Sequence, residues 1–188
     1  MDASLYTAIN GLAGHNTALD HAFLVISEAG PYFLIAFLVV LWFWPGVRAL
    51  RDRLQWGVIA AVGGSSLAVG VNRIIIQLWD RPRPFVSHPA QLLLPPSHDP
   101  SFPSDHAAFA FGVAFAIFLA SRRAGIVALL VAAAIAFSRV YTGEHYVTDV
   151  FAGALIGILS AMIVNRLRPI LTPLLDPPLR LARRLHLA

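Results

Sequence analysis

The sequence has no cysteine and no lysine, and charged residues of either sign are scarce. Without cysteine, the chain cannot form a disulfide, a thiolate nucleophile or a cysteine-ligated zinc site. Charged residues make up 13% of the 188 residues and hydrophobic residues 57%, whereas an average soluble domain carries about 25% charged residues. These deficits exclude an ordinary water-soluble domain and indicate an integral membrane protein.

Apolar runs separated by turn and charge signals recur from about residue 17 onward. Because a bilayer core of about 30 Å requires roughly 20 apolar residues per helix, we predict an all-α, polytopic membrane helix bundle of about six transmembrane helices. The predicted spans cover residues 18–29, 31–44, 54–79, 104–120, 124–141 and 147–167. Gly30 and Pro31 separate the first two spans, since this dipeptide favours a turn. Residues 1–168 are expected to form one membrane-embedded domain, followed by a cytoplasmic interfacial tail over residues 169–188.

The arginines between the predicted spans indicate the orientation. An even number of spans places most of them on one face, which the positive-inside rule assigns to the cytoplasm together with both termini. This group comprises Arg48, Arg51, Arg53, Arg122, Arg123, Arg166, Arg168, Arg180, Arg183 and Arg184. The net charge of +4 therefore reflects membrane orientation rather than nucleic-acid binding. Arg73, Arg81, Arg83 and Arg139 fall near the opposite face, where the rule gives no reason for arginine.

The stretch SRVYTGEHYVTD, residues 138–149, carries one candidate catalytic pair. His145 and Asp149 are four residues apart at the start of the last predicted helix and so share one helix face. The carboxylate can orient the imidazole and leave its other nitrogen as a nucleophile or base. The short turn before His145 can bring Arg139 back beside it. A helix-capping His145 and an Arg139 that snorkels to the interface are an equally open interpretation of this stretch alone.

The stretch SFPSDHA, residues 101–107, begins another helix on the same face. Ser104 is suited to be its N-cap, and the free amides of the first turn form an anion site. His106 lies in that turn and can donate a proton to a leaving group. An ordinary cap followed by a tolerated histidine is the alternative.

The stretch RPRPF, residues 81–85, supplies two further cations. Its prolines hold Arg81 and Arg83 in an extended segment, and guanidinium groups suit the bidentate recognition of phosphate. The alternative is an interfacial loop with incidental charges. Glu28, near the outer end of the first span, either borders the same cleft or is a solvated interfacial carboxylate.

Because topology brings the three stretches to one face, they predict one site. Arg83, Arg139 and Ser104 would hold a phosphate, with Arg81 as a further donor. This set indicates metal-independent phosphoryl transfer, since cationic donors can stabilise the transition state. A zinc site of His106, His145 and Asp149 is a minor alternative.

These motifs resemble those of the type 2 phosphatidic acid phosphatase superfamily, the membrane phosphatases related to vanadium haloperoxidases. PSDH at residues 103–106 resembles the signature PSGH, residues 138–149 match SRxxxxxHxxxD, and Arg83-Pro84 matches the end of the first signature. RPRPF, FPSDH and the short loops are most similar to the bacitracin-resistance branch of undecaprenyl-diphosphatases.

The resemblance implies that His145 attacks phosphorus to give a phosphohistidine, that Asp149 orients it and that His106 protonates the leaving group. Arg83, Ser104 and Arg139 would hold the transferred phosphoryl group.

Two positions depart from the family pattern. The family lysine, seven residues before the motif arginine, is replaced by Ile76. Arg73, one helical turn earlier, either reaches the site or pairs with Asp80. The glycine of PSGH is Asp105, for which we expect a partner such as Arg81.

We therefore expect an enzyme without metal or cofactor that releases inorganic phosphate from undecaprenyl diphosphate, recycling the lipid carrier for cell-wall synthesis. Its site would face the periplasm or cell exterior from the bacterial inner membrane, and its polyprenyl diphosphate substrate would arrive laterally among membrane lipids. A phosphatidylglycerophosphate or phosphatidic acid phosphatase would share the phosphate site. A non-catalytic protein that binds or transports anionic lipids would retain the arginines but would not need two histidines and an aspartate.

Overall fold

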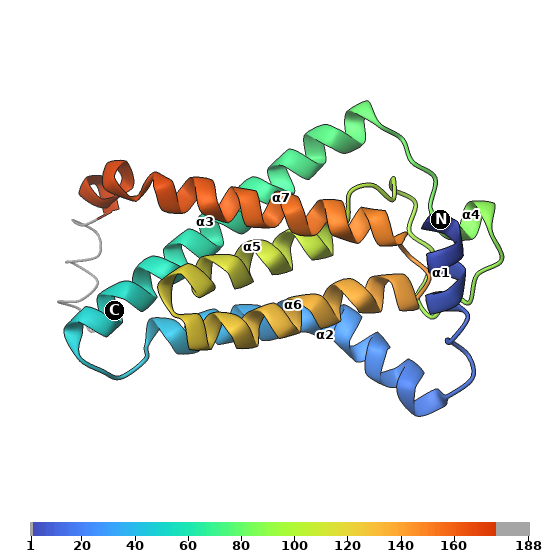
Figure 1. Cartoon of the computed structure of the whole chain (residues 1–188), viewed down its shortest axis with the longest axis horizontal. Coiled ribbons are helices and arrows are strands. Elements are labelled where there is room, and N and C mark those ends of the chain that lie inside the picture. The colour runs from blue at the N-terminus through green and yellow to red at the C-terminus, as the bar shows by residue number, and fades with distance from the viewer. Residues whose placement is uncertain (1, 176–188) are drawn as a thin grey trace.

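The computed structural model describes residues 2–175 as an elongated bundle of α-helices (Figure 1). The helices are α1 (Asp2–Asn10), α2 (Thr17–Trp42), α3 (Arg48–Leu78), α4 (Pro84–Ser87), α5 (Asp105–Ala120), α6 (Arg122–Tyr141) and α7 (Val147–Arg166). Four of them, α2, α3, α6 and α7, are long and apolar enough to cross a membrane, and α5 is a shorter apolar helix. The predicted all-α membrane bundle is confirmed, and the part of the chain described contains no strand.

Helix α2 corrects the predicted number of spans. It continues through Gly30 and Pro31 as one helix of 26 residues, so the first two predicted spans are a single one. A proline inside a helix removes a backbone hydrogen bond, but packing against neighbouring helices tolerates this in membrane proteins. Gly30 marks a close helix contact, because a Cβ there would lie 2.6 Å from Cγ1 of Ile135 on α6.

The merged helix also changes where the first and last described residues lie. Five apolar helices make an odd number of crossings. Asp2 of α1 accepts a hydrogen bond from the backbone N–H of Thr148 at the start of α7, whereas Arg168 stacks on Trp56 near the start of α3. The first and last described residues therefore lie at opposite ends of the bundle (Figure 1). This corrects the expectation that both termini share one face, while most of the predicted tail, residues 169–188, lies outside the described residues.

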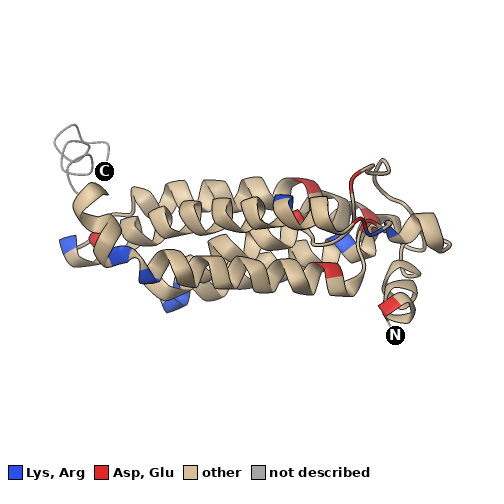
Figure 2. Ribbon diagram, turned by 90° about the horizontal axis from the view of Figure 1, so that it is seen from above, with Lys and Arg blue, Asp and Glu red and all other residues tan. Residues whose placement is uncertain are grey.

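Among residues 2–175, the two predicted groups of arginine do separate between the ends of the bundle, whereas Arg180, Arg183 and Arg184 lie outside the described residues. α3 and α6 begin, and α7 ends, at an arginine-rich end, which lies opposite α1 in Figure 2. The other end gathers the exit of α3, the start of α5 and the α6–α7 turn. The three stretches predicted to form the site therefore do meet at one end.

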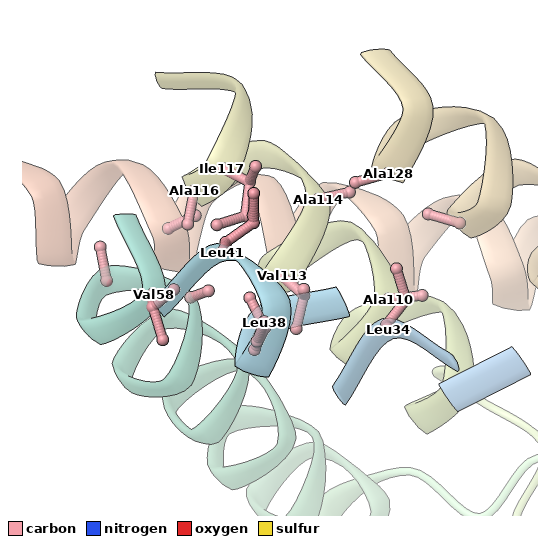
Figure 3. Packing of buried hydrophobic residues seen from close by; sticks show 14 of the residues in the cluster. Leu34, Leu38, Leu41, Val58, Ala110, Val113, Ala114, Ala116, Ile117 and Ala128 are labelled. Atoms are coloured by element: carbon pink, nitrogen blue, oxygen red, sulfur yellow. The ribbon is translucent and has the colours of Figure 1, made fainter. Parts of the chain in front are cut away.

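Helix α5 is the central element, packed against α3, α6 and α7. Leu34 and Leu38 of α2 join Val113 and Ile117 of α5 in the main hydrophobic core (Figure 3). Small residues allow close approach elsewhere, as at Gly64 of α3, where a Cβ would lie 2.9 Å from Cα of Ala161 on α7. This packing fixes the first turn of α5, which carries Ser104 and His106, relative to the neighbouring helices.

Candidate active site

A cavity of about 190 Å³ lies at the end of the bundle where the three stretches meet. Four of the residues that the sequence assigns to catalysis or phosphate binding line it, together with two that were expected nearby and five others. The lining residues are Arg73, Ile76, Arg83, Ser97, Asp99, Pro100, Pro103, Asp105, His106, Arg139 and His145. Topology alone therefore predicted most of the charged groups in this cavity.

The α6–α7 turn brings Arg139 and His145 together. The backbone N–H groups of Glu144 and His145 both donate to the carbonyl oxygen of Arg139, at 3.1 and 3.2 Å. Gly143 makes this reversal possible, because its φ of +90° is favourable only for glycine. The turn thus closes the end of α6 and places the imidazole beside the guanidinium that precedes it.

The environment of His145 leaves one ring nitrogen free. The side chain is 4% exposed, and Nδ1 lies 2.8 Å from the carbonyl oxygen of Ser101 and 3.7 Å from Oδ2 of Asp149. Since both neighbours are acceptors, Nδ1 carries the proton and Nε2 keeps its lone pair. Burial lowers the pKa of His145, so the ring is neutral near neutral pH. The Ser101 carbonyl, rather than Asp149, is the nearest orienting group, and no side-chain motif indicated it.

Asp149 lies behind His145 and is fully buried. Its Oδ2 accepts a hydrogen bond of 2.8 Å from the backbone N–H of Tyr146, and its Oδ1 accepts one of 2.5 Å from Nη1 of Arg81. Its carbonyl oxygen accepts the N–H of Ser104 at 3.1 Å. Asp149 therefore connects the starts of α5 and α7 besides lying near the imidazole.

Arg83 is held by protein acceptors on three of its nitrogens. Nη1 donates to Oε2 of Glu144 at 2.7 Å and to the Glu144 carbonyl at 3.0 Å. Nε and Nη2 donate to the carbonyl and the carboxylate of Asp99, both at 2.9 Å. Burial by itself would raise the pKa of Asp99, but Arg83 beside it holds that pKa below its usual range. Asp99 is thus an ionised partner that fixes the guanidinium plane.

Glu144, for which the sequence suggested no role, contacts several groups of the site. Its Oε2 also accepts from Oγ of Ser97 at 2.7 Å and lies 3.5 Å from Nη2 of Arg139. One buried carboxylate therefore contacts both Arg83 and Arg139. The sequence did offer one indication of this role. Glu144 directly precedes His145 and lies five residues after Arg139, and a buried carboxylate needs cationic partners.

Arg139 keeps donors available on the cavity. Nη1 donates to Oγ of Ser27 on α2 at 2.7 Å, while Nε is buried and has no hydrogen-bond partner among the residues the structure covers. A buried donor without an acceptor is destabilising. Arg139 also lines the cavity, together with Arg73 and Arg83.

Asp105 and Arg73 pair with each other. Oδ2 of Asp105 lies 3.0 Å from Nη2 of Arg73, and Oδ1 accepts from Nδ2 of Asn72 at 2.9 Å. This replaces both the expected pairing of Asp105 with Arg81 and the alternative pairing of Arg73 with Asp80. The reason is that the last turns of α3 run beside the first turn of α5.

Three other predicted residues lie outside the cavity lining. Ser104 is the N-cap of α5, as predicted, but it is fully buried and its hydroxyl accepts from the N–H of Ala107. Glu28 is exposed on α2. Arg81 faces Asp149 and Asp2 instead of the cavity.

Within residues 2–175, no three His, Asp or Glu side chains are arranged as metal ligands. The zinc alternative of His106, His145 and Asp149 also conflicts with the contacts of Asp149. Both of its carboxylate oxygens already accept hydrogen bonds, from Arg81 and from the Tyr146 amide.

The sequence model of the PAP2 superfamily matches residues 54–172, well over half of the chain. The chain belongs to this superfamily. The matched range includes the whole cavity lining, and the resemblance seen in the motifs is confirmed. The helices and the family together make this PAP2 protein a membrane phosphatase.

Named relatives extend the comparison. The undecaprenyl-diphosphatase BcrC of Bacillus subtilis is 29% identical over 184 residues, covering 96% of this chain and 91% of the relative. The bacitracin transport permease protein BcrC of Bacillus licheniformis is 35% identical over 165 residues, covering 87% and 79% of the two chains.

Two solved structures share the fold. LpxE of Aquifex aeolicus superposes with a TM-score of 0.71 at 27% identity, covering 87% of this PAP2 protein and 93% of that chain. The PAP2-type phosphatidylglycerolphosphate phosphatase of Bacillus subtilis gives a TM-score of 0.64 at 21% identity, covering 89% and 84%. The second likeness shows the fold alone.

Proposed function

We propose that this PAP2 protein hydrolyses undecaprenyl diphosphate to undecaprenyl phosphate and inorganic phosphate, without a metal, through a phosphohistidine. The observation that carries the proposal is the free Nε2 of His145, on a ring that shares one cavity with Arg83 and Arg139. Curated relatives named as undecaprenyl-diphosphatases support the choice of substrate.

The first step would form a bond between Nε2 of His145 and the terminal phosphorus. The bond from that phosphorus to the bridging oxygen breaks, and His106 gives the leaving lipid monophosphate a proton. Arg83 and Arg139 would stabilise the charge that develops on the equatorial oxygens. The Ser101 carbonyl and Asp149 would stabilise the positive charge that the ring acquires.

The second step would return the enzyme to its starting state. A water molecule attacks the phosphohistidine and gives a proton to His106, which is now neutral and acts as the base. The phosphorus–nitrogen bond breaks, and orthophosphate leaves with His145 neutral again. In this scheme the phosphohistidine reacts with water alone and the proton returns to His106, so the step needs no metal.

A lipid substrate suits the position of the cavity. Arg73, whose side chain is 58% exposed, lines the cavity and would contact the second phosphate of a diphosphate. Leu78 and Trp79, at the end of the same helix, are 83% and 60% exposed. An amphiphile with an apolar tail would therefore meet hydrocarbon-compatible surface next to the charged cavity.

The orientation follows from the arginines at the helix ends. The arginine-rich end would face the cytoplasm, which puts the cavity on the periplasmic or outer side of a bacterial inner membrane. A lipid carrier released there as a diphosphate would be recycled for peptidoglycan synthesis, and its rapid removal would confer bacitracin resistance.

The test is a substrate panel with purified protein in EDTA. Orthophosphate release is measured from undecaprenyl diphosphate, undecaprenyl phosphate, phosphatidylglycerophosphate and phosphatidic acid, with His145→Ala as the inactive control. We expect the highest kcat/KM with the polyprenyl diphosphate. Equal release by His145→Ala would overturn the mechanism, and preference for a glycerophospholipid would replace the substrate while leaving the site intact.

A further inference from the structure

Arg81 occupies a place that neither a phosphate contact nor membrane orientation explains. Its Nη1 lies 2.5 Å from Oδ1 of Asp149, and its Nη2 lies 2.7 Å from Oδ2 of Asp2. Its guanidinium carbon lies 4.2 Å from the centre of the Tyr146 ring. The guanidinium is therefore clamped between two carboxylates and one aromatic face.

Helix α1 is tied to the turn that carries His145. The hydroxyl of Tyr6 donates to the carbonyl of Gly143 at 3.4 Å, and Nδ2 of Asn10 donates to the carbonyl of Tyr141 at 2.9 Å. At its start, both the amide and the hydroxyl of Thr148 donate to Asp2. These contacts hold the Asp2 carboxylate beside Arg81.

The backbone of Arg81 supports the imidazole by a second route. Its carbonyl oxygen accepts the N–H of Ser101 at 2.9 Å, and the Ser101 carbonyl lies 2.8 Å from Nδ1 of His145. Arg81 thus holds both groups nearest to Nδ1 of His145. Its side chain holds Asp149, and its backbone holds Ser101.

Asp149 needs such a partner for a physical reason. It is fully buried, and a buried carboxylate without a cation is strongly destabilised. A bonded guanidinium also restricts its rotation, so that Oδ2 stays directed at Tyr146 and His145. Because Asp2 shares Arg81, the cation is itself held in one orientation.

We propose that Arg81 is a positioning residue for the His145–Asp149 pair, and that α1, through Asp2, is part of the same device. The proposal rests on the roles given to His145 and Asp149 under the proposed function. It replaces the expectation that Arg81 binds the phosphate.

The test separates kcat from phosphate affinity. Arg81→Gln, Arg81→Lys and Asp2→Asn are assayed on the best lipid phosphate of the panel, with orthophosphate as a competitive inhibitor. We expect Arg81→Gln to lower kcat by about tenfold or more, with KM and the inhibition constant within about twofold of wild type. Arg81→Lys should recover part of the loss, because lysine can still pair with Asp149. Asp2→Asn should lower kcat by a smaller factor, about two- to fivefold.

Arg139→Lys serves as the reference for a phosphate contact, since it should weaken orthophosphate inhibition. If Arg81→Gln instead raises KM and the inhibition constant at unchanged kcat, Arg81 is a phosphate ligand and the inference fails. If thermal unfolding in detergent shows that Arg81→Gln does not fold, the test uses Arg81→Lys and Asp2→Asn instead. A wild-type kcat in both of these variants would overturn the inference. An active His145→Ala would refute the proposed function itself, which keeps the two failures distinct.

Discussion

Oε2 of Glu144 lies 2.7 Å from Nη1 of Arg83, although their side chains are only 1% and 6% exposed. The same oxygen lies 3.5 Å from Nη2 of Arg139. A single buried negative charge therefore balances two arginines that face the cavity. The Glu144 carboxylate holds the two guanidinium groups at fixed positions. Its negative charge also weakens their attraction for an anion.

Replacing this charge should strengthen phosphate binding. Glutamine at position 144 keeps an oxygen that can accept from Arg83 and Ser97, but it removes the negative charge. We expect Glu144→Gln to bind orthophosphate about three- to tenfold more tightly, a gain of about 0.7–1.4 kcal/mol, and to release product more slowly. The inhibition constant of orthophosphate measures the effect. Asp52→Asn, which removes a negative charge paired with Arg48 at the other end of the bundle, should leave it unchanged. Weaker inhibition of a stably folded Glu144→Gln would contradict this account.

The pH dependence of activity should report the protonation of His145. Burial lowers the pKa of His145 below the ordinary histidine value of about 6.5, while Asp149 acts in the opposite direction. Attack requires the neutral ring, so the acidic limb of kcat/KM should lie below about pH 6.5. Asp149→Asn removes the charge that favours the imidazolium, so its acidic limb should move to lower pH as kcat falls. The pH profiles of wild type and variant are measured with the same substrate, so that the ionisation of the substrate affects both equally. An acidic limb that moves to higher pH in Asp149→Asn would contradict this prediction.

Arg139 should contribute strongly to the transition state. Its guanidinium lines the cavity and can contact the transferred phosphoryl group there, and the fork geometry is lost in lysine. We expect Arg139→Lys to lower kcat by about 10²-fold and to raise the inhibition constant of orthophosphate. Arg122→Lys, at the opposite end of the bundle, is the matched control and should behave as wild type. If Arg139→Lys binds orthophosphate as tightly as wild type does, Arg139 does not contact the phosphate.

The contact between α2 and α6 can be tested by stability. A Cβ at Gly30 would lie 2.6 Å from Cγ1 of Ile135, whereas a Cβ at Gly70 of α3 would meet nothing within 4 Å. Gly30→Ala should therefore destabilise the protein by about 1–3 kcal/mol, and Gly70→Ala should be neutral or slightly stabilising. Thermal unfolding in detergent measures both. Ile135→Ala should relieve part of the Gly30→Ala effect; purely additive losses would show that the two residues do not meet.

Much of the site could be predicted because membrane topology restricts where polar groups can be. Ser104 is a helix cap with a strong local signal, and its prediction as the N-cap of α5 is confirmed. His106, His145, Arg83 and Arg139 follow from helix ends that must lie on one face. Their meeting in one cavity required only the order of the helices.

Other features depend on contacts that the sequence does not encode locally. The Gly30-Pro31 pair favours the end of a helix when it is judged from the local sequence alone. In the structure α2 continues through the pair, and Gly30 packs against Ile135 of α6. The nearest acceptor for His145 is a backbone carbonyl, at Ser101, which carries no side-chain signature. Arg81 was expected at the phosphate because it shares the extended segment with Arg83. In the structure it pairs instead with Asp149 of α7 and Asp2 of α1, two carboxylates that lie far from it in the sequence.

Helix α5 has a further consequence for how deep the reaction takes place. Its 16 residues rise about 24 Å, less than the roughly 30 Å of a bilayer core. The carbonyl of its last residue, Ala120, accepts a hydrogen bond from Arg53 at the arginine-rich end, so the shortfall falls at the other end, beneath the cavity. A phosphate bound at the first turn of α5 would lie several ångströms below the membrane surface. The substrate head group would sink to the enzyme, and its tail would never have to leave the hydrocarbon.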